Sequence, residues 1–146
     1  MIIIRNKLIP FGSFRAINLF CILFAKGDRE LSESFLNHEE IHSTQIIELM
    51  ILALLLTLPL IPVIWWAPLL SPLLFYAWYG MEYLIHFISY SITWTRKFIQ
   101  GNFKKRKFVW KFAYRRISFE REAKGNEKRM DYLKNKGILS FLKYIG

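Results

Sequence analysis

Residues 38–42 of the chain, His-Glu-Glu-Ile-His, place two histidines four positions apart, with a glutamate directly after the first. Residues four apart lie on one face of a helix, so His38 and His42 can both point at one metal ion. Glu39 lies one step round the helix, where its carboxylate can reach a metal-bound water without taking a coordination position. Zn²⁺ suits such ligands and lowers the pKa of its bound water to about 7. The pattern therefore predicts a hydrolase in which Glu39 takes that water's proton and the hydroxide attacks a carbonyl.

The segment around this motif has the features of a helix, which we place over residues 32–45. Ser32 can serve as its N-cap, and no Gly or Pro follows Glu33 until Pro59. The alternative to a metal site is a solvated helix start where histidine and glutamate fall together by accident. The helical context favours the metal, because it gives the two histidines the shared face that a ligand pair needs.

Composition predicts one membrane-anchored domain. The chain has 146 residues, a formal net charge of +10 and a pI near 9.9. Hydrophobic residues make up 53% and aromatic residues 17%, which is high for a soluble protein this basic. This pairing of apolar and basic residues favours a membrane over nucleic acid, so no nucleic-acid partner is expected. Cys21 is the single cysteine, which excludes an internal disulfide.

Residues 1–30 are predicted to form a small β element. Residues 2–4 are three isoleucines, and turn-forming residues follow at 10–13. Residues 16–25 form a second apolar run, which we expect to be one buried strand with Cys21 in the core. Such a strand matters for function, because zinc peptidases commonly hold their substrate as an added β-strand beside the metal helix.

After the motif, the sequence becomes apolar over the length of two membrane spans. Residues 46–66 carry a single charge, and from 69 to 94 only Glu82 and His86 are ionisable apart from tyrosines. Each run is about one bilayer length, and a short uncharged junction joins them. We therefore expect a two-helix transmembrane hairpin over 46–94. A buried core hairpin is the alternative, but so long an uncharged stretch would need a larger soluble partner to cover it.

Basic residues follow the second run and open a region, 95–146, that is predicted to be basic and helical. Nine Lys and Arg residues lie between 96 and 116, whereas the junction of the two runs has none. By the positive-inside rule, both chain ends are cytoplasmic, and the metal lies at the cytoplasmic membrane surface. A basic stretch next to a span more often binds anionic lipid headgroups than nucleic acid, at about 1 kcal/mol per residue.

The basic region also offers a third metal ligand. Residues 110–117 carry an apolar stripe at helical spacing, and Glu120 extends that stripe. A carboxylate on the apolar face of a helix is unusual and needs a partner. Glu122 lies about 200° further round, so the two carboxylates cannot both face one ion, and Glu122 is an alternative ligand in place of Glu120. We expect the helix to break at Gly125 and residues 138–145 to form a short amphipathic tail of ordinary surface type.

Other side chains could complete or support the same site. Glu82 and His86 also stand four residues apart, and ionisable residues inside a membrane are costly and often functional. They could supply the third ligand in place of Glu120, or hydrogen-bond to each other or to Gln45. Gln45 lies seven residues after His38, on the histidine face, where it can orient substrate or a ligand.

The motif at 38–42, followed by Glu-Arg-Glu-Ala at 120–123, resembles the gluzincin metallopeptidases. In these enzymes a glutamate on a later helix, often in an E-x-x-A setting, supplies the third zinc ligand. The resemblance implies that Zn²⁺ is held by the two histidines and Glu120, with Glu39 as general base. Membrane-embedded members, such as the heat-shock and prenyl-protein proteases, place the motif helix next to transmembrane spans. Lys124 departs from the pattern, since many relatives carry an acid there that supports a ligand histidine.

The chain is also similar to a family of small, uncharacterised bacterial membrane proteins. The similarity lies in the Asn-His-Glu-x-Ile-His core at 37–42 and the Ile-Ser-Phe-Glu-Arg-Glu-Ala tail at 117–123. It implies a protein of the bacterial inner membrane. Together these patterns predict a membrane-bound zinc metallopeptidase that acts on a protein or peptide substrate. A non-catalytic basic adaptor that binds anionic lipid or a protein partner is the alternative.

Overall fold

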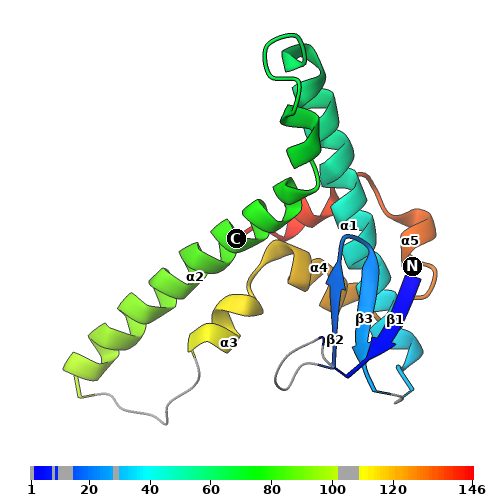
Figure 1. Ribbon diagram of the computed structural model, residues 1–146. Coiled ribbons are helices and arrows are strands. Elements are labelled where there is room, and N and C mark those ends of the chain that lie inside the picture. The colour runs from blue at the N-terminus through cyan, green and yellow to red at the C-terminus, as the bar shows by residue number, and fades with distance from the viewer. Residues whose placement is uncertain (1, 8, 10–14, 28–29, 102–108) are drawn as a thin grey trace.

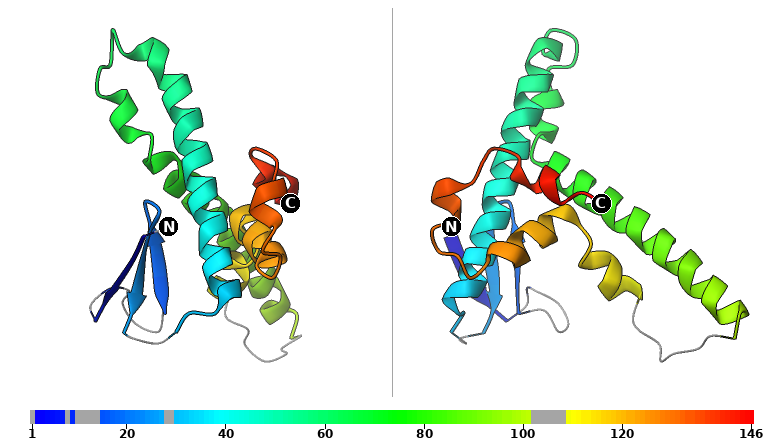
Figure 2. Two further views of the ribbon diagram at one scale, coloured as in Figure 1. Left: turned by 90° about the vertical axis from the view of Figure 1, so that its right-hand side faces the viewer. Right: turned by 180° about the vertical axis from the view of Figure 1, so that it is seen from behind.

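A computed structural model describes residues 2–7, 9, 15–27, 30–101 and 109–146. The chain is mainly helical, with a small three-stranded sheet near its N-terminus, as the sequence predicts (Figure 1). Helix α1 (Glu33–Thr57) lies between this sheet and the C-terminal helices (Figure 2). The turn predicted near 10–13 and the basic residues at 104–107 lie outside the described residues.

The sheet contains three strands, β1 (Ile2–Asn6), β2 (Ala16–Leu19) and β3 (Ile22–Lys26). Their order is β1-β3-β2, with β1 parallel and β2 antiparallel to β3, so β2 lies at an edge. The prediction of one buried strand over 16–25 is wrong. Phe20 and Cys21 both have positive φ and form a two-residue turn, which folds the run into a hairpin.

Helix α1 carries the histidine motif in its first turns and the apolar run in its later ones. The Ser32 hydroxyl accepts a hydrogen bond from the Phe35 amide, which confirms the predicted N-cap. The residues of α1 up to Leu49 include most of its buried positions, and the last turns project beyond the body of the protein (Figure 1). The helix ends as the chain approaches Pro59, which cannot donate a helical hydrogen bond.

Two short 3₁₀ segments, η1 (Leu58–Leu60) and η2 (Ala67–Leu70), lead from α1 into α2 (Leu73–Ile99). Helix α2 runs back from this turn and diverges from α1 (Figures 1 and 2). Among the described residues, one helix, Glu33–Leu60, is long and apolar enough to cross a membrane. The predicted pair of helices with a turn is therefore present, while their passage through a membrane stays a prediction.

Four short elements complete the chain: α3 (Val109–Tyr114), α4 (Ser118–Asn126), α5 (Tyr132–Asn135) and η3 (Ser140–Tyr144). The helix predicted to break at Gly125 ends one residue later, at Asn126, but a further break at 115–117, which was not predicted, separates α3 from α4. The prediction that 138–145 forms a surface tail is wrong for Ser140 and Phe141, which are buried. Phe141 is 1% exposed, and its ring centroid lies 4.4 Å from that of Phe119. Aromatic burial thus fixes the C-terminal segment on α4.

Candidate metal centre

Helices α1 and α4 bring the two motif histidines and one glutamate together. His42 Nε2 lies 3.3 Å from Glu120 Oε1, His38 Nε2 lies 3.7 Å from Glu120 Oε2, and the two Nε2 atoms are 3.1 Å apart. Ligand atoms about 2.0–2.2 Å from a tetrahedral ion lie about 3.3–3.6 Å from one another. His42 and Glu120 are buried, and one ligand atom from each of the three residues lies within 4.8 Å of the others. Donor types and spacing therefore fit a zinc ion.

Glu82 fixes the start of α4, the helix that carries Glu120. Its carboxylate accepts hydrogen bonds from the Ser118 amide (2.6 Å), the Ser118 hydroxyl (2.8 Å) and Trp78 Nε1 (2.8 Å). This contact caps a helix N-terminus from a second helix and explains why α3 and α4 are separate. Neither Glu82 nor His86 is among the described residues that line the pocket at the histidines. The structure therefore does not bring this pair to the metal group.

Asn37, directly before the motif, fixes the other end of α4. Its Nδ2 group donates to the carbonyl oxygens of Asn126 (3.2 Å), Glu127 (3.0 Å) and Arg129 (3.1 Å). These carbonyl groups lie where a helix lacks internal partners for its last carbonyls. Because Asn37 and His38 are neighbours on α1, this contact also sets the position of Glu127 beside the histidine.

Glu127 is a functional candidate that the sequence analysis missed. Its Oε2 lies 3.4 Å from His38 Nδ1, a buried nitrogen that has no hydrogen-bond partner within the described part of the chain. Lys124, where many gluzincins carry a supporting acid, is instead exposed and pairs with Glu127 Oε1 at 2.7 Å. A carboxylate is therefore present near His38 after all, one turn later. The spacing of seven residues from Glu120, two helical turns, was the available signal.

The charges of His38, His42 and Glu120 depend on one proton, which His42 carries. Burial lowers the pKa of His38 and the charge of His42 lowers it further, to about 4. Burial would lower the pKa of His42 too, but the Glu120 carboxylate reverses this and raises it to about 9. Burial would raise the pKa of Glu120, but His42 lowers it to about 2. The proton on His42 thus balances Glu120, and a metal ion must displace it to bind.

A pocket of about 310 Å³ opens beside these side chains. It is lined by Glu39 and the ligand candidates, by all four residues of β2, and by Phe75, Tyr76 and Tyr79 at the start of α2. Burial raises the pKa of Glu39, whose carboxylate lies close enough to His42 and Glu120 to be affected by both. The Tyr79 hydroxyl donates to Glu120 Oε1 at 2.8 Å, another contact that sequence patterns did not reveal. The site therefore combines three ligand candidates, a separate carboxylate and space for a substrate.

Strand β2 is held against the motif helix by Asn18. Its Nδ2 group donates to the Glu39 carbonyl oxygen (2.8 Å) and the Ser43 hydroxyl (2.9 Å). In the antiparallel pairing with β3, Ile17 and Leu19 occupy the hydrogen-bonded positions. The main-chain groups of Ala16 therefore point away from β3, at the edge where the strand lines the pocket. The sheet edge and the metal group thus share one pocket.

No family model, curated protein or solved structure matches this chain. The resemblance to gluzincins therefore remains that of two short motifs. Any assignment of function depends on the geometry described above and on the contacts that hold it.

Gln45 contacts the His42 ring on the side that faces away from the metal group. His42 Nδ1 lies 2.8 Å from Gln45 Oε1, while Gln45 Nε2 donates to Glu122 Oε2 (2.9 Å) and to the Phe119 carbonyl oxygen (3.2 Å). Because both partners of Nε2 are acceptors, the amide can have only one orientation. Its oxygen then accepts from His42 Nδ1, which leaves Nε2 of the neutral ring to face the metal group.

Glu122 supports this arrangement from the opposite side of α4. It is fully buried and accepts hydrogen bonds from the Tyr132 hydroxyl (2.7 Å) and the Ser140 hydroxyl (2.5 Å). Lys136 Nζ lies 3.7 Å from it and pairs with both Glu48 carboxylate oxygens at 2.7 and 2.8 Å. Glu122 therefore lies outside the group of three ligand candidates, and its partners tie the C-terminal segment to α1.

Exchanging Gln45 and Glu122 tests this support. Gln45→Glu alone places two buried carboxylates about 2.9 Å apart, so we expect zinc affinity to fall about 10–100-fold, the usual cost of losing a supporting partner. Glu122→Gln alone should also weaken binding. The double variant Gln45→Glu/Glu122→Gln restores one carboxylate and one amide and should recover part of the affinity, because a carboxylate at position 45 cannot donate to the Phe119 carbonyl oxygen. Zinc affinity is measured by competition with a chelating dye, and a double variant no better than the single ones would contradict the coupling.

Proposed function

We propose that this protein is a membrane-attached, zinc-dependent hydrolase that cleaves a peptide bond. The observation that carries the proposal is the convergence of His38, His42 and Glu120 on one point beside Glu39, at the wall of a pocket. Two neutral nitrogens, one carboxylate and room for a further ligand are the donor set of a catalytic zinc site. A purely structural zinc site would have four protein ligands and no open coordination position.

The chain's own residues divide the work of such a reaction. Zinc at this group would act as a Lewis acid and lower the pKa of a bound water to about 7. Glu39 lies outside the ligand candidates, so its carboxylate is available to take a proton and return it to the leaving amine. Its raised pKa brings it closer to the range in which a side chain can do both. Gln45 hydrogen-bonds the His42 ring, and the Glu127 carboxylate lies beside the His38 ring.

The pocket supports a peptide as the substrate. Strand β2 is the sheet edge on the pocket side, and an extended peptide can add to such an edge through main-chain hydrogen bonds. Phe75 and Tyr76 offer apolar surface for a side chain next to the bond to be cut. The proposed substrate is therefore a protein or peptide in extended conformation.

Membrane attachment is part of the same proposal. The turn between α1 and α2 is uncharged and its large apolar side chains are exposed, which is costly in water. A transmembrane hairpin over 46–94, cytoplasmic chain ends and contact of the stretch 96–116 with anionic headgroups stay predictions. A basic adaptor without catalysis remains the second candidate, favoured by the net charge of +10.

Metal content separates the two candidates. We expect the purified full chain to hold about one zinc per molecule by elemental analysis, and His42→Ala to lose it. His86→Ala is the matched control, because it removes the third histidine, which lies away from the pocket, and should keep its zinc. Protein that is free of metal and unaffected by chelators would favour the adaptor and contradict the hydrolase.

A further inference from the structure

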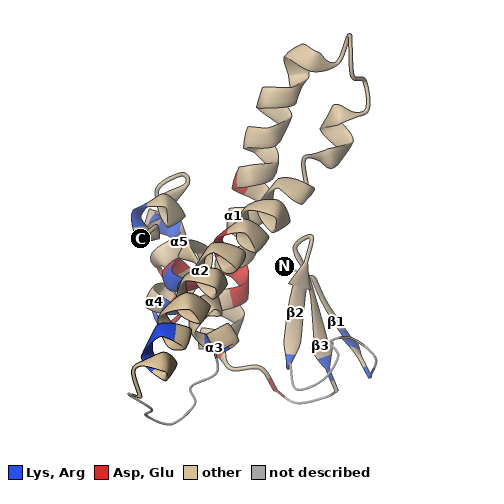
Figure 3. Cartoon of the chain, turned by 90° about the vertical axis from the view of Figure 1, so that its left-hand side faces the viewer, with Lys and Arg blue, Asp and Glu red and all other residues tan. Residues whose placement is uncertain are grey.

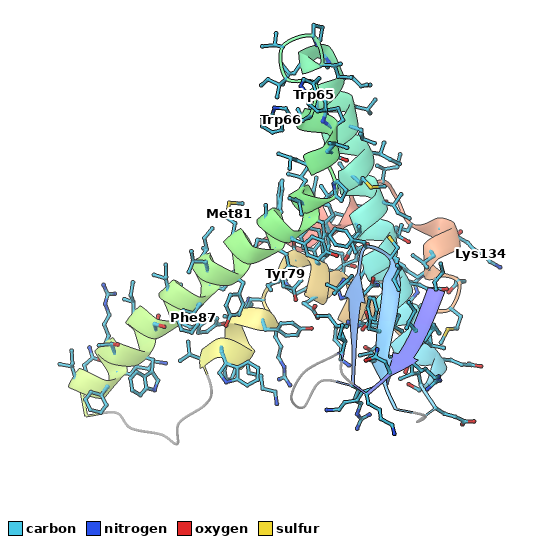
Figure 4. The ribbon with its side chains drawn as sticks, in the orientation of Figure 1. Trp65, Trp66, Tyr79, Met81, Phe87 and Lys134 are labelled. Carbon is cyan, nitrogen blue, oxygen red and sulfur yellow. The ribbon has the colours of Figure 1, made fainter. Side chains whose placement is uncertain are left out.

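Residues 55–70, here called the spike, form the outermost part of the turn between α1 and α2 (Figure 4). The spike carries no charged residue (Figure 3), and ten of its large hydrophobic side chains are exposed. Val63 (83%) and Trp65 (75%) are the most exposed of them. Apolar surface that is this continuous and contains no charge is typical of a surface that meets lipid or another protein.

The base of the spike is fixed to the body of the protein. On the α1 side, Ala53 is buried; on the α2 side, the Phe75 ring lies 4.8 Å from Phe119 of α4. Further along α2, Glu82 caps α4 through Ser118. The first turns of α2, which the sequence assigns to a membrane span, are therefore docked on the helix that carries Glu120. Towards the turn between α1 and α2, only the spike projects beyond this contact.

The length of the spike decides how deep it can reach. Each limb has about eight residues, which at 1.5–2.0 Å per residue gives about 12–16 Å. The hydrocarbon core of a bilayer is about 30 Å thick, so the spike reaches roughly its middle.

Placing Trp65 at the far interface would require about 30 Å of helix below it, or about 20 residues. That distance ends near Gln45, which is bonded to Phe119 and Glu122 at the level of the metal centre. Glu48, three residues nearer the spike than Gln45, and its partner Lys136 would then have to enter hydrocarbon.

A second apolar surface lies on α2, on the face opposite α3. Met81 points to the same side of α2 as the spike (Figure 4). Exposed apolar side chains continue from it at helical spacing, at Leu84, Ile85, Ile88 and Ile92. Arg96 and Lys97 follow in the last turn of α2. An apolar face that ends in basic residues is typical of a helix lying along an anionic membrane surface.

We infer that the protein enters one leaflet of an anionic bilayer from one side, with the spike in the acyl chains and α2 along the headgroups. The inference deepens the membrane attachment proposed above and does not depend on catalysis. It differs from the transmembrane hairpin in one respect, because the turn at Trp65 and Trp66 stays inside the bilayer. The pocket, lined by the first turns of α2, then opens next to the membrane surface.

Trp65 and Trp66 allow the depth to be measured with the full-length protein. It is added to vesicles of phosphatidylcholine and phosphatidylglycerol that carry bromine either near the headgroups or near the ends of the acyl chains. The fluorescence of Trp65 and Trp66 is obtained by subtracting the fluorescence of the Trp65→Phe/Trp66→Phe variant from that of the wild type. We expect bromine near the ends of the acyl chains to quench this fluorescence more strongly than bromine near the headgroups. Stronger quenching by headgroup bromine would place the turn at an interface and overturn the single-leaflet arrangement.

Flotation of the protein with the same vesicles separates depth from attachment. Val63→Asp puts a charge in the spike and should weaken vesicle binding about 100-fold. Ile138→Asp is the matched control, since Ile138 is 86% exposed but lies outside the spike, and it should bind like the wild type. Equal loss in both variants would contradict insertion of the spike. A wild-type protein that does not float would overturn both the insertion and the membrane attachment.

Discussion

Glu39→Gln should leave the zinc in place and lower turnover about 10²–10⁴-fold, the usual contribution of a general base. The side chain is buried at the pocket and lies outside the three ligand candidates, so an amide of the same shape should not disturb them. Turnover is measured on a substrate found by comparing membrane proteomes of cells with and without the protein. Bound zinc is measured on the same preparations by elemental analysis.

Glu40→Gln is the matched control for this experiment. Glu40 is the next residue of the motif, and its side chain is exposed. Its substitution by glutamine removes the same charge as Glu39→Gln. It should keep both zinc and turnover. A Glu39→Gln protein that retains full turnover would remove Glu39 from the mechanism. If this variant instead loses both zinc and turnover, Glu39 supports the metal rather than moving a proton.

The arrangement around the motif was accessible from the sequence because it depends on local spacing. An interval of four residues fixes the relation of His38 to His42 on any helix, and Ser32 as N-cap fixes where that helix begins. Glu120 was singled out by an apolar stripe that assumed one continuous helix from 110 onwards. The structure places Glu120 beside the histidines although that helix is broken. The carboxylate faces the histidines because contacts at both ends orient α4, from Glu82 to Ser118 and from Asn37 to Asn126.

Contacts between distant segments were not accessible in the same way. Phe20 and Cys21 both have positive φ, although neither is a glycine or an asparagine. The residue types that usually indicate such a turn are therefore missing from the sequence. Phe141 belongs to a short segment of ordinary composition, and only its ring partners on α4 show that it is core. The sequence offers His86 and Gln45 as partners of Glu82, whereas the structure pairs it with Ser118, 36 residues away. For Phe141 and Glu82 the deciding partner is a tertiary contact, which sequence periodicity does not encode.

Removal of the third ligand candidate should have the second large effect. We expect Glu120→Gln to lower zinc affinity by more than about 100-fold, since loss of a supporting partner alone costs about 10–100-fold. The glutamine oxygen can still accept the Tyr79 hydrogen bond, so α4 should stay in place. Affinity is measured by competition with a chelating dye, and circular dichroism shows whether the fold is kept. Glu127→Gln, which changes only the carboxylate behind His38, should cause the smaller loss of a supporting residue.

The same titration on Glu82→Ala and His86→Ala decides between the two possible sources of a third ligand. The structure turns Glu82 towards Ser118, so its loss should lower stability more than intrinsic zinc affinity. His86→Ala should leave the affinity unchanged, because this residue is not among the described residues at the pocket. If either variant loses the metal while Glu120→Gln keeps it, the ligands lie within the α1–α2 hairpin. The gluzincin assignment would then be wrong, and the buried pair of His42 and Glu120 would be an ion pair that stabilises the fold rather than a metal site.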